Sequence, residues 1–221
     1  MATILCLETA TINCSVALSQ NGNLSACKEE TNKNYSHAEQ LHLFIDSVAQ
    51  EAGISLTALD AIAVGMGPGS YTGLRIGVSA AKGLCYALDV PLIAISTLAL
   101  LASQSKQDSD FIVPMLDARR MEVYAAVFNA EKQQLRSIEA EIVTENSYQE
   151  YLKQGTVTFI GNGMDKFQSL CRNENAKFEQ GQWPSACSMS VLAEEKYRLG
   201  QFEDVAYFEP FYLKDFMGKT P

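Results

Sequence analysis

The pattern of apolar and polar residues predicts that the chain begins with three strands. Residues 3–8 form an apolar run, residues 14–20 alternate, and residues 24–30 follow an Asn21-Gly22 pair. That pair is a strong signal for a tight hairpin between two strands. We therefore expect three antiparallel strands at the start of the chain.

A long helix and alternating shorter elements are predicted next. Apolar residues recur at helical spacing within residues 36–52. Ser36 and Glu39 form a capping box, S-x-x-E, at the start of this helix, and Gly53 ends it. The elements expected after it alternate between strand and helix, over residues 61–65, 71–88, 91–95 and 96–101.

The second half of the chain repeats this order of elements at low identity. Glu8 aligns with Asp117, and VGMG at 64–67 aligns with IGNG at 160–163, where in each case a strand runs into G-x-G. The strands expected in this half cover 111–118, 121–129, the region of Leu135 and 156–163. The helices expected there cover 147–152 with Asn146 as cap, a segment from Met164, and 188–199.

This repetition predicts an α/β protein with two lobes of related topology. Each lobe is expected to hold a mixed sheet built in the order β-β-β-α-β-α. The lobes cover residues 1–105 and 106–221. We expect a cleft between them, with one carboxylate, Glu8 or Asp117, at the end of each first strand.

The segment MGPGSYTGLRIG at 66–77 is the most distinctive motif. It lacks the Gly-Lys-Ser/Thr ending of a Walker A loop. Gly67-Pro68-Gly69 fits a type II turn with positive φ at Gly69, and Ser70 or Thr72 can cap the following helix. A helix N-terminus also attracts anions, so phosphate binding stays open as the less favoured alternative.

The helix expected at 71–88 is apolar on more than one side and carries interior glycines. Each such glycine costs about 1 kcal/mol relative to alanine, so another interaction should offset it. A helix that is apolar on several sides is buried on several sides. Two interpretations remain: a central core helix, or a helix shared between the core and a partner protein.

Composition and charge limit the classes of function that the chain can have. The chain has 221 residues, 47% of them hydrophobic, and a net charge of −9, which argues against direct binding of a nucleic-acid backbone by this chain alone. No signal peptide and no apolar run long enough to span a membrane are visible, so we expect a cytoplasmic protein without membrane association. The six cysteines form no C-x-x-C pair, and we expect buried, reduced thiols.

Metal binding and catalysis find little support in the sequence. His37 and His42 are five residues apart, about 140° around a helix, so we expect an exposed His37, a partly packed His42 and no metal. Glu8 and Asp117 could hold Mg²⁺, but the loops after them lack the glycines and lysine that cradle phosphates. We favour a structural role for both. No G-x-S-x-G motif is present.

Four segments together closely resemble the bacterial TsaB (YeaZ) family. They are ILCLETATINCSVAL, GMGPGSYTGLRIGVSAAKGLCYAL, PLIAISTLALLA and LDARRMEVYAAVF, within residues 3 to about 130. The resemblance implies a two-lobed, ribonuclease-H-like fold similar to actin, sugar kinases and Hsp70. One departure is Glu8, where most members of the family have aspartate.

The resemblance also implies a function. TsaB-like proteins are degenerate relatives of the catalytic subunit TsaD and pair with it. With the ATPase TsaE they help to make the threonylcarbamoyl group on N6 of adenosine 37 in tRNA. The chain is therefore expected to be a non-catalytic subunit that contacts tRNA only within the complex. The resemblance leaves undecided whether the free chain forms a homodimer. The alternatives are a metallopeptidase of the glycoprotease type and an autonomous nucleotide-hydrolysing enzyme.

Site residues follow from the same resemblance. No catalytic or metal-binding residue is expected, and ATP, ADP and metal are assigned to the partner or to the subunit junction. The residues expected to contact the partner are His37, Leu41, Phe44, Ile45, Tyr71, Leu74, Arg75, Ile76, Val78 and Lys82. The residues expected to form a vestigial nucleotide or phosphate site are Glu8, Thr9, Gly67, Gly69, Ser70, Asp117, Gly161 and Gly163.

Overall fold

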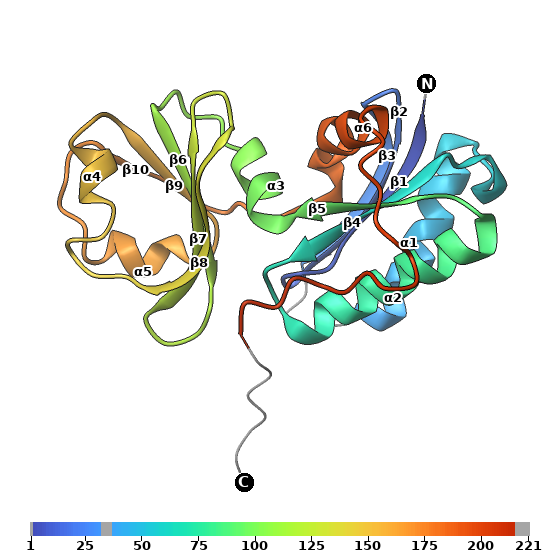
Figure 1. Cartoon of the computed structure of the whole chain (residues 1–221), viewed down its shortest axis with the longest axis horizontal. Helices are drawn as coiled ribbons and strands as arrows, with labels where there is room; N and C mark the ends of the chain where they lie inside the picture. Colours follow the sequence, from blue (N-terminus) through green and yellow to red (C-terminus); the bar gives the residue numbers. More distant parts are fainter. Residues whose placement is uncertain (1, 32–36, 215–221) are drawn as a thin grey trace, which may run out of the picture. The chain divides into compact units, whose positions relative to one another are not determined.

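The computed structural model describes residues 2–31 and 37–214 and separates into two compact units (Figure 1). Unit 1 comprises Met1–Leu100 and Pro184–Phe211, and unit 2 comprises Leu101–Trp183 and Tyr212–Pro221. The chain thus returns to the first unit near its end, whereas the expected lobe boundary placed all of 106–221 in the second. None of the described helices is long and apolar enough to cross a membrane.

Unit 1 is built on a five-stranded mixed sheet in the order β3-β2-β1-β4-β5. The strands β1, β2 and β3 are antiparallel neighbours, and β4 and β5 continue the sheet in parallel with β1. This confirms the three strands and the hairpin predicted from the sequence. The bounds are β1 (Thr3–Glu8), β2 (Asn13–Gln20), β3 (Asn23–Thr31), β4 (Ala61–Gly67) and β5 (Leu92–Ser96).

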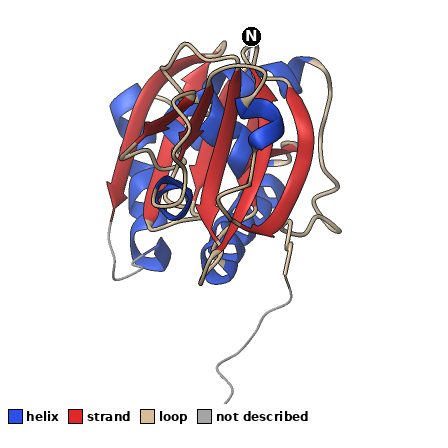
Figure 2. Cartoon of the chain, turned by 90° about the vertical axis from the view of Figure 1, so that its left-hand side faces the viewer, coloured by secondary structure: helices blue, strands red, loops and turns tan. Residues whose placement is uncertain are grey.

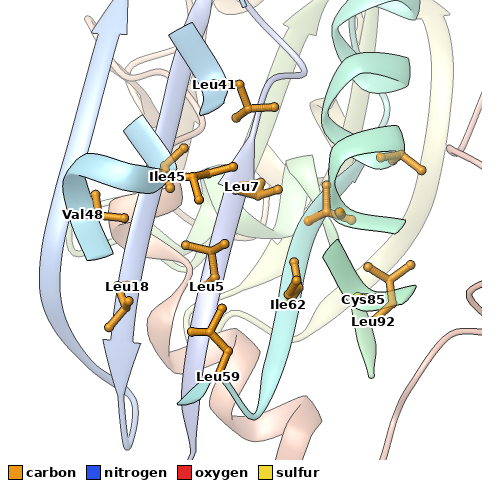
Figure 3. Packing of buried hydrophobic residues seen from close by; sticks show 14 of the residues in the cluster. Leu5, Leu7, Leu18, Leu41, Ile45, Val48, Leu59, Ile62, Cys85 and Leu92 are labelled. Carbon is orange, nitrogen blue, oxygen red and sulfur yellow. The ribbon is translucent and has the colours of Figure 1, made fainter. Parts of the chain in front are cut away.

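Two long helices, α1 (His37–Ala52) and α2 (Tyr71–Leu88), cover one face of this sheet. Their buried residues pack against Leu5 and Leu7 of β1, as Figure 3 shows for part of the cluster. A short 3₁₀ turn, η1 (Leu56–Ala58), lies between α1 and β4. The predicted cap of α2 is confirmed at Ser70, whereas Ser36, the predicted cap of α1, lies outside the described residues.

The opposite face of the first sheet is covered by the returning segment. It contains a 3₁₀ turn, η2 (Ala186–Ser188), and a helix, α6 (Ser190–Arg198). Their residues are buried against Ile4 and Cys6 of β1, which alternate with the residues facing α1 and α2. This burial of a second sheet face explains why the segment belongs to unit 1.

A disulfide between Cys27 of β3 and Cys187 of η2 adds to this attachment. Their Cα atoms are 5.7 Å apart, within the range that disulfides need. The expectation of six reduced thiols is therefore wrong for this pair. The two cysteines are 160 residues apart in sequence, so no local pattern reveals that they meet. The four other cysteines are buried thiols, Cys6, Cys14, Cys85 and Cys171.

Unit 2 repeats the topology of unit 1, as the sequence predicted. Its sheet has the order β10-β9-β6-β7-β8, so the first strand of the unit again lies in the centre, between the second and the fourth. Figure 2 draws the strands as red arrows. The first strand again pairs with the second in antiparallel and with the fourth in parallel orientation. The bounds are β6 (Phe111–Asp117), β7 (Glu122–Asn129), β8 (Gln134–Ile142), β9 (Val157–Ile160) and β10 (Ala176–Glu179).

The helices of unit 2 are much shorter than those of unit 1. They are α3 (Thr97–Ser103), which begins in unit 1, α4 (Gln149–Leu152) and α5 (Met164–Gln168). Asn146 was predicted to cap α4, but the residue at the cap position is Tyr148. The strand β10 was not predicted from the sequence.

The end of unit 1 runs as a strap, which we define as residues 200–211, beside β5 and α2 (Figure 1). Glu203 forms an isolated bridge with Leu92 of the edge strand β5. The Lys82 ammonium of α2 donates to the carbonyls of Ala206 (3.2 Å) and Phe208 (2.9 Å). The strap therefore shields part of a sheet edge that would otherwise be open to pairing with another strand.

Candidate functional site

Glu8 ends β1 as a fully buried carboxyl group. Its Oε1 accepts a hydrogen bond from the Ala10 backbone N–H (2.6 Å), and its Oε2 has no hydrogen-bond partner among the described residues. Burial raises its pKa to about 7, although the backbone hydrogen bonds from Ala10 and Thr9 oppose this shift. Oε2 faces Gly65, where a Cβ atom would come closer than 3.0 Å. The group is thus enclosed by the chain itself.

This enclosure predicts a pH-dependent stability. The native pKa lies above the ordinary value of 4.5, so the native state retains this proton over a pH range in which the unfolded chain has lost it. The free energy of unfolding should then fall by about 3 kcal/mol as pH rises from about 4.5 to about 7. In Glu8→Gln this component should be absent. Urea unfolding at pH 5 and pH 8 measures the difference, and equal pH dependence in both proteins would contradict it.

The glycine-rich turn differs from the predicted type II turn. Gly67 has the positive φ, +111°, and the Gly67–Pro68 peptide bond is cis, whereas Gly69 has no positive φ. Gly69 has a different reason to be glycine, because a Cβ atom there would lie within 3.0 Å of the Ala10 carbonyl oxygen. The Ser70 N–H donates to that same oxygen (2.7 Å). The turn is therefore closed onto the segment that follows β1.

The first turns of α2 are packed on the same segment. The Ser70 hydroxyl accepts from the Gly73 N–H (3.3 Å), and the Thr9 hydroxyl donates to the Gly73 carbonyl (2.7 Å). A Cβ atom at Gly73 or Gly77 would lie within 3.0 Å of Thr9 atoms. Residues that could have bound a phosphate at this helix N-terminus instead bind the protein's own backbone, which favours the structural interpretation of the turn.

Unit 2 shows the same arrangement at the end of β6. The Asp117 Oδ1 accepts from the Arg119 N–H (2.6 Å) and from the Lys166 ammonium (2.8 Å). Gly161 has φ +101°, and a Cβ atom there or at Gly163 would lie within 3.0 Å of the backbone of β6. The residues expected to form a vestigial phosphate site thus belong to two groups, one in each unit, in which glycines allow a close approach to the first strand.

The two histidines are placed opposite to expectation. His37 is buried, and its Nε2–H donates to the Thr11 carbonyl (2.7 Å), whereas His42 is exposed. The expectation failed because the β1–β2 connection supplies a backbone acceptor that the local sequence does not reveal. Among the described residues, no three His, Cys, Asp or Glu side chains are grouped to hold a metal ion.

Five of the ten residues expected to contact a partner lie in the core of unit 1. They share the helix stripes that face the sheet, and they are His37, Leu41, Ile45, Leu74 and Val78. Without these five buried residues, the expected contact set consists of five residues that are half-buried or exposed: Phe44, Tyr71, Arg75, Ile76 and Lys82. Of these, Arg75 stacks over the ring of Tyr71 at 4.2 Å, and Lys82 binds the strap.

An outward face of α2 was missed by sequence reasoning. It is exposed at Thr72, Ser79, Gly83 and Ala87, and a Cβ atom at Gly83 would meet nothing within 4 Å. The neighbouring Tyr86 is 87% exposed. The helical spacing of small residues could have indicated this face, but the buried glycines of the same helix obscured it.

Comparisons with known proteins relate the chain to proteins of tRNA threonylcarbamoyladenosine biosynthesis. Residues 29–215 match the family model TsaD: tRNA N6-adenosine threonylcarbamoyltransferase. The tRNA threonylcarbamoyladenosine biosynthesis protein TsaB of Escherichia coli K12 is 30% identical over 96% of this chain and 94% of its own length.

Solved structures confirm the predicted fold class, an actin-like α/β fold with duplicated mixed sheets. YeaZ from Pseudomonas aeruginosa has a TM-score of 0.86 and 29% identity, and the match covers 96% of this chain and 100% of that one. The activator of 2-hydroxyisocaproyl-CoA dehydratase from Clostridium difficile, solved with bound ADPNP, shares the fold at a TM-score of 0.50, with 9% identity over 90% of this chain and 96% of that one. The chain therefore belongs to the TsaB (YeaZ) family of tRNA threonylcarbamoyladenosine biosynthesis proteins.

Proposed function

We propose that the chain is a non-catalytic subunit of a cytoplasmic complex that makes threonylcarbamoyladenosine at position 37 of tRNA. In this proposal it pairs with a TsaD-like catalytic subunit and acts with a TsaE-like ATPase. Family membership supports the pathway. The closed glycine-rich turn, with Ser70 and Gly73 bound to the chain's own atoms, supports the absence of chemistry in this subunit.

The observation that carries the pairing is Gly83. An interior helix glycine costs about 1 kcal/mol relative to alanine. Glycine is required at Gly73 and Gly77 by the chain itself, because Thr9 occupies the space that a Cβ atom would need. The space beside Gly83 is open. A partner backbone that approaches α2 closely at Gly83 would offset this cost.

The surroundings of Gly83 fit a partner surface. The helices α1 and α2 lie on the same face of the first sheet and contact each other. Leu43 of α1 is 66% exposed and Tyr86 of α2 is 87% exposed. Large exposed side chains supply apolar area that a partner can bury. Aromatic side chains such as Tyr86 do so with little loss of conformational freedom. We define the α1–α2 face as Leu43, Arg75, Ser79, Gly83 and Tyr86.

Nucleotide and metal are assigned in this proposal to the partner or to the subunit junction. Glu8 has its Oε1 bonded to Ala10 and its Oε2 against Gly65, and Asp117 is paired with Lys166. Neither carboxylate has a glycine-rich loop following it in sequence. We expect the isolated chain to hydrolyse ATP at the rate of a buffer blank, and turnover abolished by Asp117→Ala would contradict this.

Co-purification tests the pairing. The tagged chain and an untagged TsaD-like protein from the same genome should elute as one complex at micromolar concentration in size-exclusion chromatography. If the free chain elutes as a homodimer, addition of the TsaD-like protein should dissociate it, because both complexes would use the α1–α2 face. Separate elution of the two proteins over the whole micromolar range would contradict the proposed pairing.

A further inference from the structure

The turn between β6 and β7 holds two consecutive arginines in a backbone conformation that arginine rarely adopts. Arg119 has φ +71° and Arg120 has φ +50°. In left-handed backbone the Cβ atom crowds the following carbonyl oxygen, which costs free energy at each residue other than glycine. Such strain persists where the surroundings hold the conformation, and it clusters at functional sites.

The surroundings of this turn do hold it. The Asp117 Oδ1 accepts from the Arg119 N–H (2.6 Å), and the Glu122 N–H donates to the Arg119 carbonyl (3.1 Å). The Ala118 N–H donates to the Glu122 carbonyl (3.0 Å). The backbone that carries the two arginines is therefore fixed before any ligand arrives.

The charged side chains around the turn pair with one another and not with the two guanidinium groups. Lys166 is paired with Asp117 at 2.8 Å, and Lys214 is paired with Glu122, so these four charges neutralise one another. Both arginines are exposed. Neither guanidinium group has an ion pair or hydrogen bond with any residue in 2–31 or 37–214. A chain with a net charge of −9 thus presents two neighbouring unpaired positive charges on a backbone that hydrogen bonds hold in place.

We propose that Arg119 and Arg120 contact the phosphodiester backbone of the tRNA on which the complex acts. This rests on the function proposed above. A guanidinium group matches two phosphate oxygens with two parallel N–H donors, and neighbouring forks on a rigid turn can reach successive phosphates. Two contacts on an otherwise acidic chain are too few for RNA binding by this chain alone, but they orient tRNA held by the whole complex.

The test uses the assembled complex of this chain with TsaD-like and TsaE-like proteins. The probe is an unmodified tRNA transcript with adenosine at position 37, titrated at several salt concentrations between 50 and 200 mM. The double variant Arg119→Gly/Arg120→Gly removes both guanidinium groups and also relieves the strain, since glycine accepts positive φ. The double variant Lys106→Gln/Lys153→Gln is the control, because it removes two exposed positive charges elsewhere in unit 2.

We expect the arginine variant to bind tRNA about 10-fold more weakly and to lower the slope of log K against log salt by about one to two. Its melting temperature should rise, which excludes misfolding as the cause. The lysine control should retain both affinity and slope. Wild-type affinity and slope in the arginine variant would overturn the proposal, as would a loss of ATP binding in place of tRNA binding. If the wild-type mixture modifies no tRNA, the proposed function fails and this contact fails with it.

Discussion

Gly73→Ala is expected to destabilise unit 1 by about 3 kcal/mol or more. A Cβ atom at this position would lie within 3.0 Å of the Thr9 carbonyl oxygen, which is backbone and cannot rotate away. The helix would have to move off the segment after β1, and this movement would also break the hydrogen bond from the Thr9 hydroxyl to the Gly73 carbonyl. Urea unfolding of the purified variant measures the loss.

Gly83→Ala is the matched control, because it makes the same substitution in the same helix. A Cβ atom at Gly83 meets nothing within 4 Å, so only the gain in helix propensity remains, about 1 kcal/mol in favour of the variant. The two substitutions should therefore have opposite signs. A similar effect of both on the free energy of unfolding would show that α2 does not pack on Thr9 as the structure has it.

Gly83→Glu is expected to weaken binding of the TsaD-like partner at least 100-fold, about 3 kcal/mol at 25 °C. The substitution places a charge and a bulky side chain where we propose that a partner backbone approaches closely. An unpaired charge at the centre of an interface costs several kcal/mol. Because the space beside Gly83 is open in the free chain, the variant should fold normally. Sedimentation or calorimetric titration with the partner measures the affinity.

Ala130→Glu controls for the added charge. Ala130 is exposed at the turn between β7 and β8 in unit 2, outside the α1–α2 face. This variant should bind the partner with unchanged affinity. Wild-type affinity in a folded Gly83→Glu variant would place the partner surface elsewhere on the chain.

The elements with strong local signals were predictable from the sequence. The first three strands, α2 and its Ser70 cap follow from alternation, helical spacing and capping chemistry within a few residues of sequence. The duplication of the sheet was predictable because the order of elements repeats even where residues do not. The strand β10 was missed, since four residues of mixed polarity carry no periodic signal.

The features that depend on distant contacts were not predictable. The return of 184–211 to unit 1 and the Cys27–Cys187 disulfide depend on a sheet face that only the folded chain presents. His37 was expected to be exposed because its acceptor, the Thr11 carbonyl, is remote in sequence. The turn at Gly69 was misassigned for the same reason, since the close approach of Ala10 and not a positive φ requires glycine there.

The residues expected to contact a partner were drawn from both faces of α1 and α2, and their role in binding stays a prediction. Apolar periodicity cannot tell a stripe that faces the sheet from one that faces a partner, so Leu41 and Leu74 were included although both are buried. Gly83 was recognised only as one of several helix glycines. Its distinction from Gly73 requires knowledge of what lies beside each Cα atom.

Reconstitution of tRNA modification tests most directly whether the complex requires this chain as a subunit. TsaD-like and TsaE-like proteins, a threonylcarbamoyl donor, ATP and unmodified tRNA are combined with and without this chain, and threonylcarbamoyladenosine is quantified by mass spectrometry of the digested tRNA. We predict modification with the wild-type chain and with Glu8→Gln, and loss of modification without the chain or with Gly83→Glu. Equal modification in the presence and absence of the chain would contradict the role proposed for it.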